Sequence, residues 1–123
     1  MRDRGFTLIE LLVALAIIAM LLTLAAPRYF TSVDRAREAV LQENLYLIRH
    51  AIDKFYGDKG HYPATLDELV EQRYLRRLPV DPVLDSRTGW VVVPPQDPSL
   101  GAVYEVRSGA RGKALDGTPY QDW

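Results

Sequence analysis

The stretch GFTLIELLVALAIIAMLLTLAAP, residues 5–27, decides the fold of the N-terminal part of this chain. From Phe6 to Ala26 it contains one ionisable side chain, that of Glu10. At about 1.5 Å per residue, a helix over this run crosses a hydrocarbon core of about 30 Å. The run therefore predicts a membrane-spanning helix. A charge inside such a helix costs about 2.5–3.5 kcal/mol on insertion scales, so we expect Glu10 to have a partner and a function.

A short basic leader precedes the apolar run. Arg2 and Arg4 lie in this leader, and Gly5 separates it from the run. A secretory signal peptide has its small residues after the apolar run, whereas here the small residue comes first. A cut at Gly5 would therefore leave the run in the mature chain. The leader favours a cytoplasmic N-terminus by the positive-inside bias, although arginines beyond the run oppose this orientation.

Length and composition limit the remaining possibilities. The chain has 123 residues, enough for one small domain after the apolar run. Its formal net charge is -1, so it lacks the excess of positive charge that attracts nucleic acid, and we expect no nucleic-acid partner. It has no cysteine, which excludes a disulfide framework and a thiolate metal site.

The apolar pattern after Pro27 is again helical. Apolar residues recur at spacings of three and four and form one stripe: Val33, Ala36, Val40, Leu41, Leu45, Ile48, Ala51, Ile52 and Phe55. This pattern predicts an amphipathic helix that ends at Gly57 as its C′ residue. The two helical halves together would run from Phe6 to about Tyr56, and Pro27 would either bend the helix or be tolerated within it.

The remainder of the chain predicts a small sheet and one short helix. Thr65 and Glu68 form a capping box, which predicts a short helix ending near Tyr74. Strand-like runs follow at 90–93 and 102–106, and the Gly-rich tail is expected to be mostly loop. The predicted fold is α+β, with a long N-terminal helix packed on a small antiparallel sheet and a short helix in the connecting loop.

The sequence Gly5-Phe6-Thr7-Leu8-Ile9-Glu10 closely resembles the cleavage and methylation motif of type IV pilin-like proteins. This resemblance implies that a prepilin peptidase removes a leader, residues 1–5, and methylates the new amine of Phe6. It further implies a transmembrane and filament-core helix over 6–27 and a periplasmic pilin-like domain over 28–123. In an assembled filament, the Phe6 amine of one copy would lie beside Glu10 of a neighbour, and Pro27 would close the core helix.

The soluble part is most similar to the major, G-type pseudopilin of type II secretion systems. The resemblance rests on GHYPATLDEL at residues 60–69, on Val80-Asp81-Pro82 and on the missing cysteines, whereas the insertion at 83–90 departs from the pattern. It implies a subunit of a periplasmic filament that drives protein export across the outer membrane. The implied partners are copies of the chain, minor pseudopilins and an inner-membrane assembly platform, and the chain itself would not be an enzyme.

The same resemblance suggests a calcium ion in the C-terminal loop. Asp116 and Asp122 are the carboxylates of the tail that could bind it, because calcium prefers hard oxygen ligands. The tail contains only these two acidic residues, and their spacing is not that of an EF-hand. The simpler interpretation is a turn at Asp116-Gly117 and a solvated Asp122.

Catalytic interpretations have little support. His50 lies off the apolar stripe and His61 lies in a predicted loop, so both are expected to be exposed. The segment 109–113 lacks the spacing of a phosphate-binding loop and is expected to be a turn. Two alternatives to a secretion subunit stay open. One is a pilin of a surface or DNA-uptake pilus, and the other is a monomeric membrane-anchored periplasmic binding protein.

Overall fold

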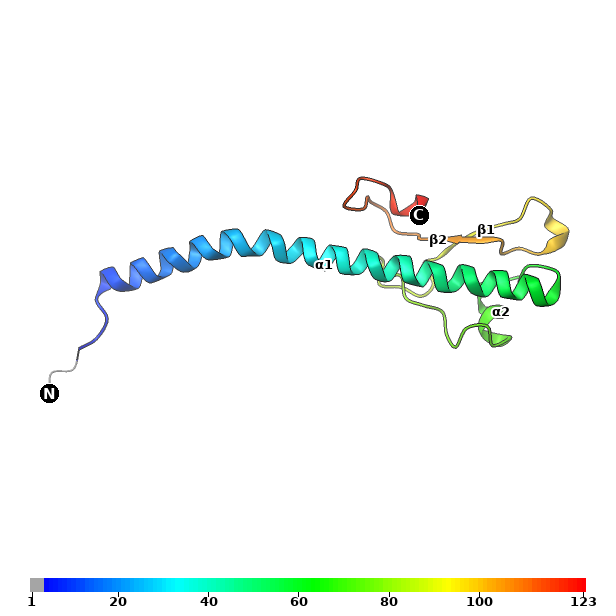
Figure 1. The fold of residues 1–123 in the computed structure, drawn as a ribbon, viewed down its shortest axis with the longest axis horizontal. Helices are drawn as coiled ribbons and strands as arrows, with labels where there is room; N and C mark the ends of the chain where they lie inside the picture. The colour runs from blue at the N-terminus through cyan, green and yellow to red at the C-terminus, as the bar shows by residue number, and fades with distance from the viewer. Residues whose placement is uncertain (1–3) are drawn as a thin grey trace. The chain divides into compact units, whose positions relative to one another are not determined.

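A computed structural model describes residues 4–123 of the chain. Residues 4–123 form two α-helices, α1 (Leu8–Lys59) and α2 (Leu66–Glu71), and two strands, β1 (Val91–Val93) and β2 (Glu105–Arg107). Two short 3-10 helices, η1 (Pro98–Leu100) and η2 (Tyr120–Asp122), were not predicted. Figure 1 shows this order of elements, which confirms the predicted α+β fold. The chain divides into two compact units, one that ends at Asp34 and one that comprises Arg35–Trp123.

The first unit contains the N-terminal part of α1. None of its described side chains is buried. The helix continues through Pro27, which has no N–H to donate to the carbonyl of Thr23. Thr31 Oγ1 donates to the Pro27 carbonyl at 3.0 Å, and Thr23 Oγ1 donates to the Met20 carbonyl at 2.6 Å. The proline is therefore tolerated within continuous helix, with threonine hydroxyls bonded to the backbone on both sides of it.

The second unit is organised around the C-terminal part of α1. The helix buries one face, made by Leu41, Leu45, Ile48, Ala51, Ile52 and Phe55. This confirms the amphipathic pattern from Leu41 onward. The earlier part of the predicted stripe is wrong as a buried face, because Val40 is 48% exposed and Ala36 is also exposed. In this unit, the packed core begins only where the rest of the domain meets the helix.

The end of α1 differs from the prediction. The helix passes over Gly57 and ends at Lys59, and Gly60 follows with a φ of 75°. The Gly60 N–H donates to the Tyr56 carbonyl at 2.8 Å. A residue in the left-handed region ends a helix at low cost when it is glycine. Of the two glycines near the end of the helix, Gly60 and not Gly57 takes the left-handed conformation that ends it.

Helix α2 begins as predicted at the capping box. The Glu68 N–H donates to Thr65 Oγ1 at 3.2 Å, and Glu68 Oε2 accepts from the Ala64 N–H at 2.7 Å. The helix ends at Glu71, earlier than the predicted Tyr74, because Arg73 takes a φ of 64°. Leu69 is fully buried against the face of α1.

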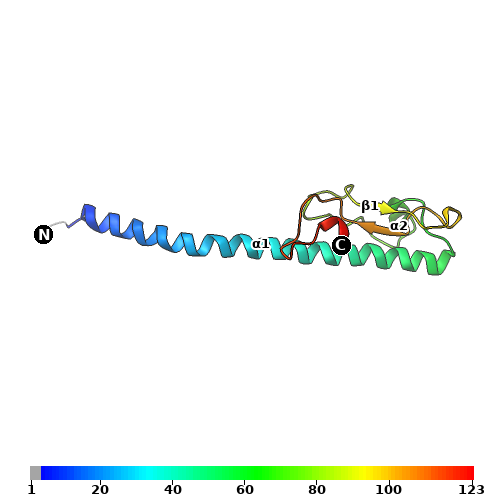
Figure 2. The ribbon, with the colours of Figure 1, turned by 90° about the horizontal axis from the view of Figure 1, so that it is seen from above.

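The two strands form an antiparallel pair in which Val92 lies opposite Val106. They run alongside the part of α1 that belongs to the same unit (Figure 1; Figure 2). Strand β2 starts later than the predicted Ala102, because the N–H groups of Ala102 and Val103 donate to the Pro63 carbonyl instead of to β1. The connection that follows α1 is therefore hydrogen-bonded to the residues just before β2. Trp90, Val103 and Val106 complete the core.

A buried carboxylate joins two loops of the second unit. Asp81 is fully buried, and its Oδ1 accepts from the N–H groups of Val83 and Leu84 at 3.0 and 3.2 Å. Its Oδ2 accepts from Ser108 Oγ at 2.5 Å, and Ser108 Oγ in turn accepts from the Ala110 N–H at 3.1 Å. These bonds satisfy a charge that would otherwise be costly to bury. They attach the start of the tail to the loop before β1.

Candidate functional site

The predicted processing point lies in an open segment before α1. Gly5 and Phe6 have no regular secondary structure, and the Phe6 side chain is 92% exposed. Apart from Gly5 itself and its two chain neighbours, no described residue has a heavy atom within 4 Å of where a Cβ on Gly5 would be. Residues 1–3 of the predicted leader lie outside the described residues. In the described part, the Gly5–Phe6 peptide bond is free of the steric cover that would keep it from a peptidase.

Glu10 has a local partner that the sequence analysis missed. The Thr7 N–H donates to Glu10 Oε2 at 3.1 Å, and the Glu10 N–H donates to Thr7 Oγ1 at 3.2 Å. These reciprocal bonds are a capping box at the start of α1. The signal was present in the sequence as Thr-x-x-Glu, the same pattern that predicted α2. The carboxylate thus lies at a helix N-terminus, where the helix dipole favours negative charge.

The apolar run around Glu10 is entirely exposed within the chain. Its large side chains are between 52% and 75% exposed from Leu8 to Leu24. By length and composition α1 is able to cross a membrane, and none of its most apolar stretch is buried. Within the first unit, the described residues therefore leave this surface uncovered, which suits contact with lipid or with other copies of the helix.

The two carboxylates proposed for calcium have different surroundings. Asp116 Oδ1 accepts from the Thr118 N–H at 2.9 Å and from Thr118 Oγ1 at 2.6 Å. The hydroxyl, and to a lesser degree the amide, hold the pKa of Asp116 below its usual value. Gly117 has a φ of 88°, so Asp116 and Gly117 form the turn of the simpler interpretation. Asp122 is exposed in η2.

These residues do not fit a preformed calcium site. Calcium takes six to eight oxygen ligands. Nowhere in residues 4–123 does a group of three or more His, Asp or Glu side chains come together to hold a metal. Calcium binding by Asp116 and Asp122 stays a prediction.

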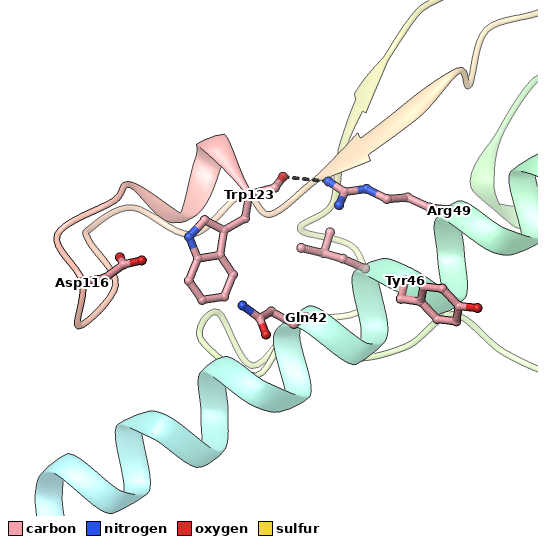
Figure 3. Close-up of a pocket in the computed structure, with 6 residues that line it drawn as sticks. Gln42, Tyr46, Arg49, Asp116 and Trp123 are labelled. Atoms are coloured by element: carbon pink, nitrogen blue, oxygen red, sulfur yellow. Dashed lines mark hydrogen bonds between the residues drawn. The ribbon is translucent and has the colours of Figure 1, made fainter.

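An open cleft of about 350 Å³ lies between the tail and α1. Figure 3 shows that Asp116 and Trp123 line it from the tail, while Gln42, Tyr46 and Arg49 line it from the helix. An Arg49 nitrogen donates to the Trp123 carbonyl at 2.6 Å. The cleft therefore marks a surface where the tail is bonded to the helix.

The histidines have structural surroundings. His50 is exposed and stacks on Tyr46 with ring centroids 5.7 Å apart. His61 is exposed and packs edge-on against Phe55 at 5.5 Å. Their predicted exposure is confirmed.

Comparison with known proteins adds the family. The family model for the prokaryotic N-terminal methylation motif matches residues 1–26. The type II secretion system core protein G of Escherichia coli (strain K12) is 31% identical over 97 residues, covering 66% of this chain and 67% of that protein. The chain belongs to this core protein G family.

Other members of the core protein G family and one pilin also match. The core protein G of Dickeya chrysanthemi is 28% identical over 115 residues, covering 94% of this chain and 74% of that protein. The type IV major pilin protein PilA of Myxococcus xanthus (strain DK1622) is 34% identical over 68 residues, covering 55% of this chain and 31% of that protein. No solved structure matches the chain.

The methylation motif contains three of the predicted site residues. Gly5, Phe6 and Glu10 lie within residues 1–26, whereas Pro27 lies just beyond the match. The motif and the apolar N-terminal helix fit a core protein G that is anchored in the inner membrane. The predicted resemblance to pilin-like proteins, and to the G-type pseudopilin in particular, is confirmed.

Proposed function

We propose that this chain is a structural subunit of a type II secretion pseudopilus, a periplasmic filament that drives protein export across the outer membrane. One observation carries the proposal. In this member of the core protein G family, an apolar helix segment has no buried side chain, and its single ionisable residue, Glu10, lies at its start. In a soluble monomer this apolar surface would be exposed to water. In a filament subunit it is covered first by lipid in the membrane and later by copies of the same helix.

Processing comes first in the proposed sequence of events. A prepilin peptidase cuts between Gly5 and Phe6 and methylates the new amine, which stays cationic. The methylation motif and the exposed, non-helical segment at these two residues support this step. The chain then spans the inner membrane once, with its N-terminus in the cytoplasm and residues 28–123 in the periplasm.

The energetics of Glu10 explain both storage and assembly. The N-cap side chain of Thr7 stabilises the start of the helix by about 0.5–2 kcal/mol, and the helix dipole favours the Glu10 carboxylate by about 0.3–1 kcal/mol. A charge at the centre of a membrane helix costs about 2.5–3.5 kcal/mol, and less near the interface, where the first turn of α1 would lie. The cap thus offsets part of the cost in lipid. Glu10 Oε1 has no bond within residues 4–123, so it is available to the Phe6 amine of a neighbouring copy.

That contact would desolvate two opposite charges together instead of separately, which favours assembly over the isolated subunit. It would also set the axial register between copies, as a single buried polar residue does in coiled coils. Pro27 leaves the Thr23 carbonyl without its usual donor, so the helix is easiest to open locally at this point when the copies pack.

The proposed partners follow from this role. They are copies of the chain, minor pseudopilins, the prepilin peptidase and an inner-membrane assembly platform. We expect no catalytic activity from the chain and no nucleic-acid partner. The energy for assembly would come from a cytoplasmic ATPase acting through the platform.

A deletion in the native host tests the function. We expect loss of the chain to abolish release of secreted proteins and to spare transformation. The match to the Myxococcus xanthus pilin supports a second candidate, a surface or DNA-uptake pilus subunit. Loss of transformation with normal protein release would favour that candidate. A chain that stays monomeric in mild detergent, even when produced with the assembly machinery, would instead favour a membrane-anchored binding protein.

A further inference from the structure

The tail of this chain, residues 108–123, is bonded to one face of α1 at two points. The first point is Glu38. Its Oε1 accepts from the Leu115 N–H at 2.7 Å and from the Tyr120 hydroxyl at 3.0 Å. One helix side chain thus fixes both the turn region of the tail and the start of η2.

The second point is Arg49, about three helical turns further along the same face. Its Nη2 donates to the Trp123 carbonyl at 2.6 Å and to the Val106 carbonyl at 3.0 Å, and its Nε donates to Glu105 Oε1 at 2.6 Å. Figure 3 shows the bond to Trp123 beside the cleft. Arg49 therefore joins β2, the last residue of the tail and the helix.

The tail is also closed on itself by protein atoms. The Ala114 N–H donates to the Thr118 carbonyl at 2.7 Å, and Trp123 Nε1 donates to Thr118 Oγ1 at 2.9 Å. Two residues of the tail itself, Ala110 and Ala114, are buried. Asp116, one of the two carboxylates proposed for calcium, accepts from the Thr118 amide and hydroxyl with one of its oxygens.

We infer that the tail is fastened to α1 by a metal-independent clamp, Glu38 and Arg49, in the place where the resemblance to pseudopilins suggests a calcium ion. Here a helix carboxylate, that of Glu38, accepts from an amide and a hydroxyl of the tail, and the loop carboxylate of Asp116 accepts from Thr118. Both clamp residues lie within Arg35–Trp123, so the inference does not depend on the proposed filament.

Limited proteolysis of the full chain in detergent micelles tests the clamp. Arg111 and Lys113 are exposed in the tail and are trypsin sites, and cleavage tracks how often the tail opens. We expect the rate of cleavage after these residues to be the same, within about twofold, in excess EDTA and in excess calcium chloride. A calcium-dependent slowing greater than about fivefold would overturn the inference.

Variants of Glu38 separate the clamp from general stability. We expect Glu38→Ala to speed tail cleavage at least about fivefold in both solutions. Glu38→Gln should stay close to the original rate, since an amide oxygen accepts the same two bonds. Glu43→Ala, which removes an exposed carboxylate from the same helix, is the matched control and should change nothing. Hydrogen exchange over 41–55 reports whether each variant keeps its core. Unchanged cleavage of a folded Glu38→Ala chain would contradict the clamp, and the EDTA comparison decides the question even where that variant unfolds.

Discussion

The two units of this chain treat apolar surface and charge in opposite ways. Up to Asp34, none of the described side chains is buried, although most of them are apolar. In Arg35–Trp123, twelve hydrophobic residues are buried, and every buried polar side-chain atom has a hydrogen-bond partner. The second unit covers its apolar side chains and satisfies its buried polar atoms with its own residues. The first unit has a surface that only lipid or other molecules can complete.

Two carboxylates make the contrast concrete. Asp81 receives three donors from its own chain, two amides and the Ser108 hydroxyl. Glu10 receives one donor among the described residues, the Thr7 amide. The first carboxylate is part of a finished core, whereas the second keeps capacity for a partner outside the chain.

The largest effect is expected in the core of the second unit. Phe55 is 1% exposed, so Phe55→Ala should lower the free energy of unfolding by about 3–5 kcal/mol. Leu47 lies on the same helix and is 41% exposed, so Leu47→Ala should cost about 0.5 kcal/mol or less. Denaturant unfolding of the full chain in micelles, followed by Trp fluorescence, measures both. Equal costs would show that the second unit is not packed as described.

The next effect concerns the buried carboxylate. Ser108→Ala removes the donor to Asp81 Oδ2 and should cost about 1–3 kcal/mol, because a buried acceptor is left unsatisfied. Ser99→Ala, which removes an exposed hydroxyl bonded to Asp97, is the control and should cost less. The same unfolding experiment measures both. If Ser108→Ala lowered the free energy of unfolding no more than Ser99→Ala, Asp81 would not be a buried carboxylate that depends on the Ser108 hydroxyl.

The charge of Glu10 should matter for assembly more than for folding. Glu10→Gln keeps an acceptor for the Thr7 amide and loses the charge, whereas Glu10→Ala loses both. If the charge pairs with another copy, both variants should be processed and inserted but should reduce sheared filaments at least about tenfold, equivalent to about 1.4 kcal/mol. Normal assembly of Glu10→Gln would mean that the cap alone accounts for this residue.

The smallest effect is expected in the tail turn, and it depends on pH. Thr118 lowers the pKa of Asp116, so this contribution to stability is present above the ordinary pKa of the carboxyl and is lost as the pH falls through the lowered value. Thr118→Val should therefore lower the melting temperature slightly at pH 7, with the difference shrinking in acid. Thr118→Ser keeps the hydroxyl and should behave as the original chain. A difference that is independent of pH would assign the effect to the Trp123 contact instead.

The sequence predicted the elements whose signals are local. The long apolar run, the stripe from Leu41 to Phe55 and the capping box at Thr65 all depend on residues within a few turns of one another, and the structure contains each of them. The predicted exposure of both histidines belongs to the same class.

The rest depended on partners far along the chain. Strand β2 starts late because Pro63, about forty residues away, accepts the bonds of Ala102 and Val103. The contact of Glu38 with the tail joins residues 77 and 82 positions apart, which no local pattern specifies. The Thr7–Glu10 capping box is also a local pattern. It was not predicted, because Glu10 was interpreted only as a charge within the apolar run.

In the proposed filament, the Glu10 carboxylate of one copy contacts the Phe6 amine of another. Solid-state NMR on mixed filaments measures this directly, with ¹³C at the Glu10 carboxyl in one half of the subunits and ¹⁵N at the Phe6 amine in the other half. We expect carbon–nitrogen dipolar dephasing in the mixed filaments. Because the two labels are never in the same chain, such dephasing can come only from a contact between copies. Full-length filaments that show no dephasing would contradict it.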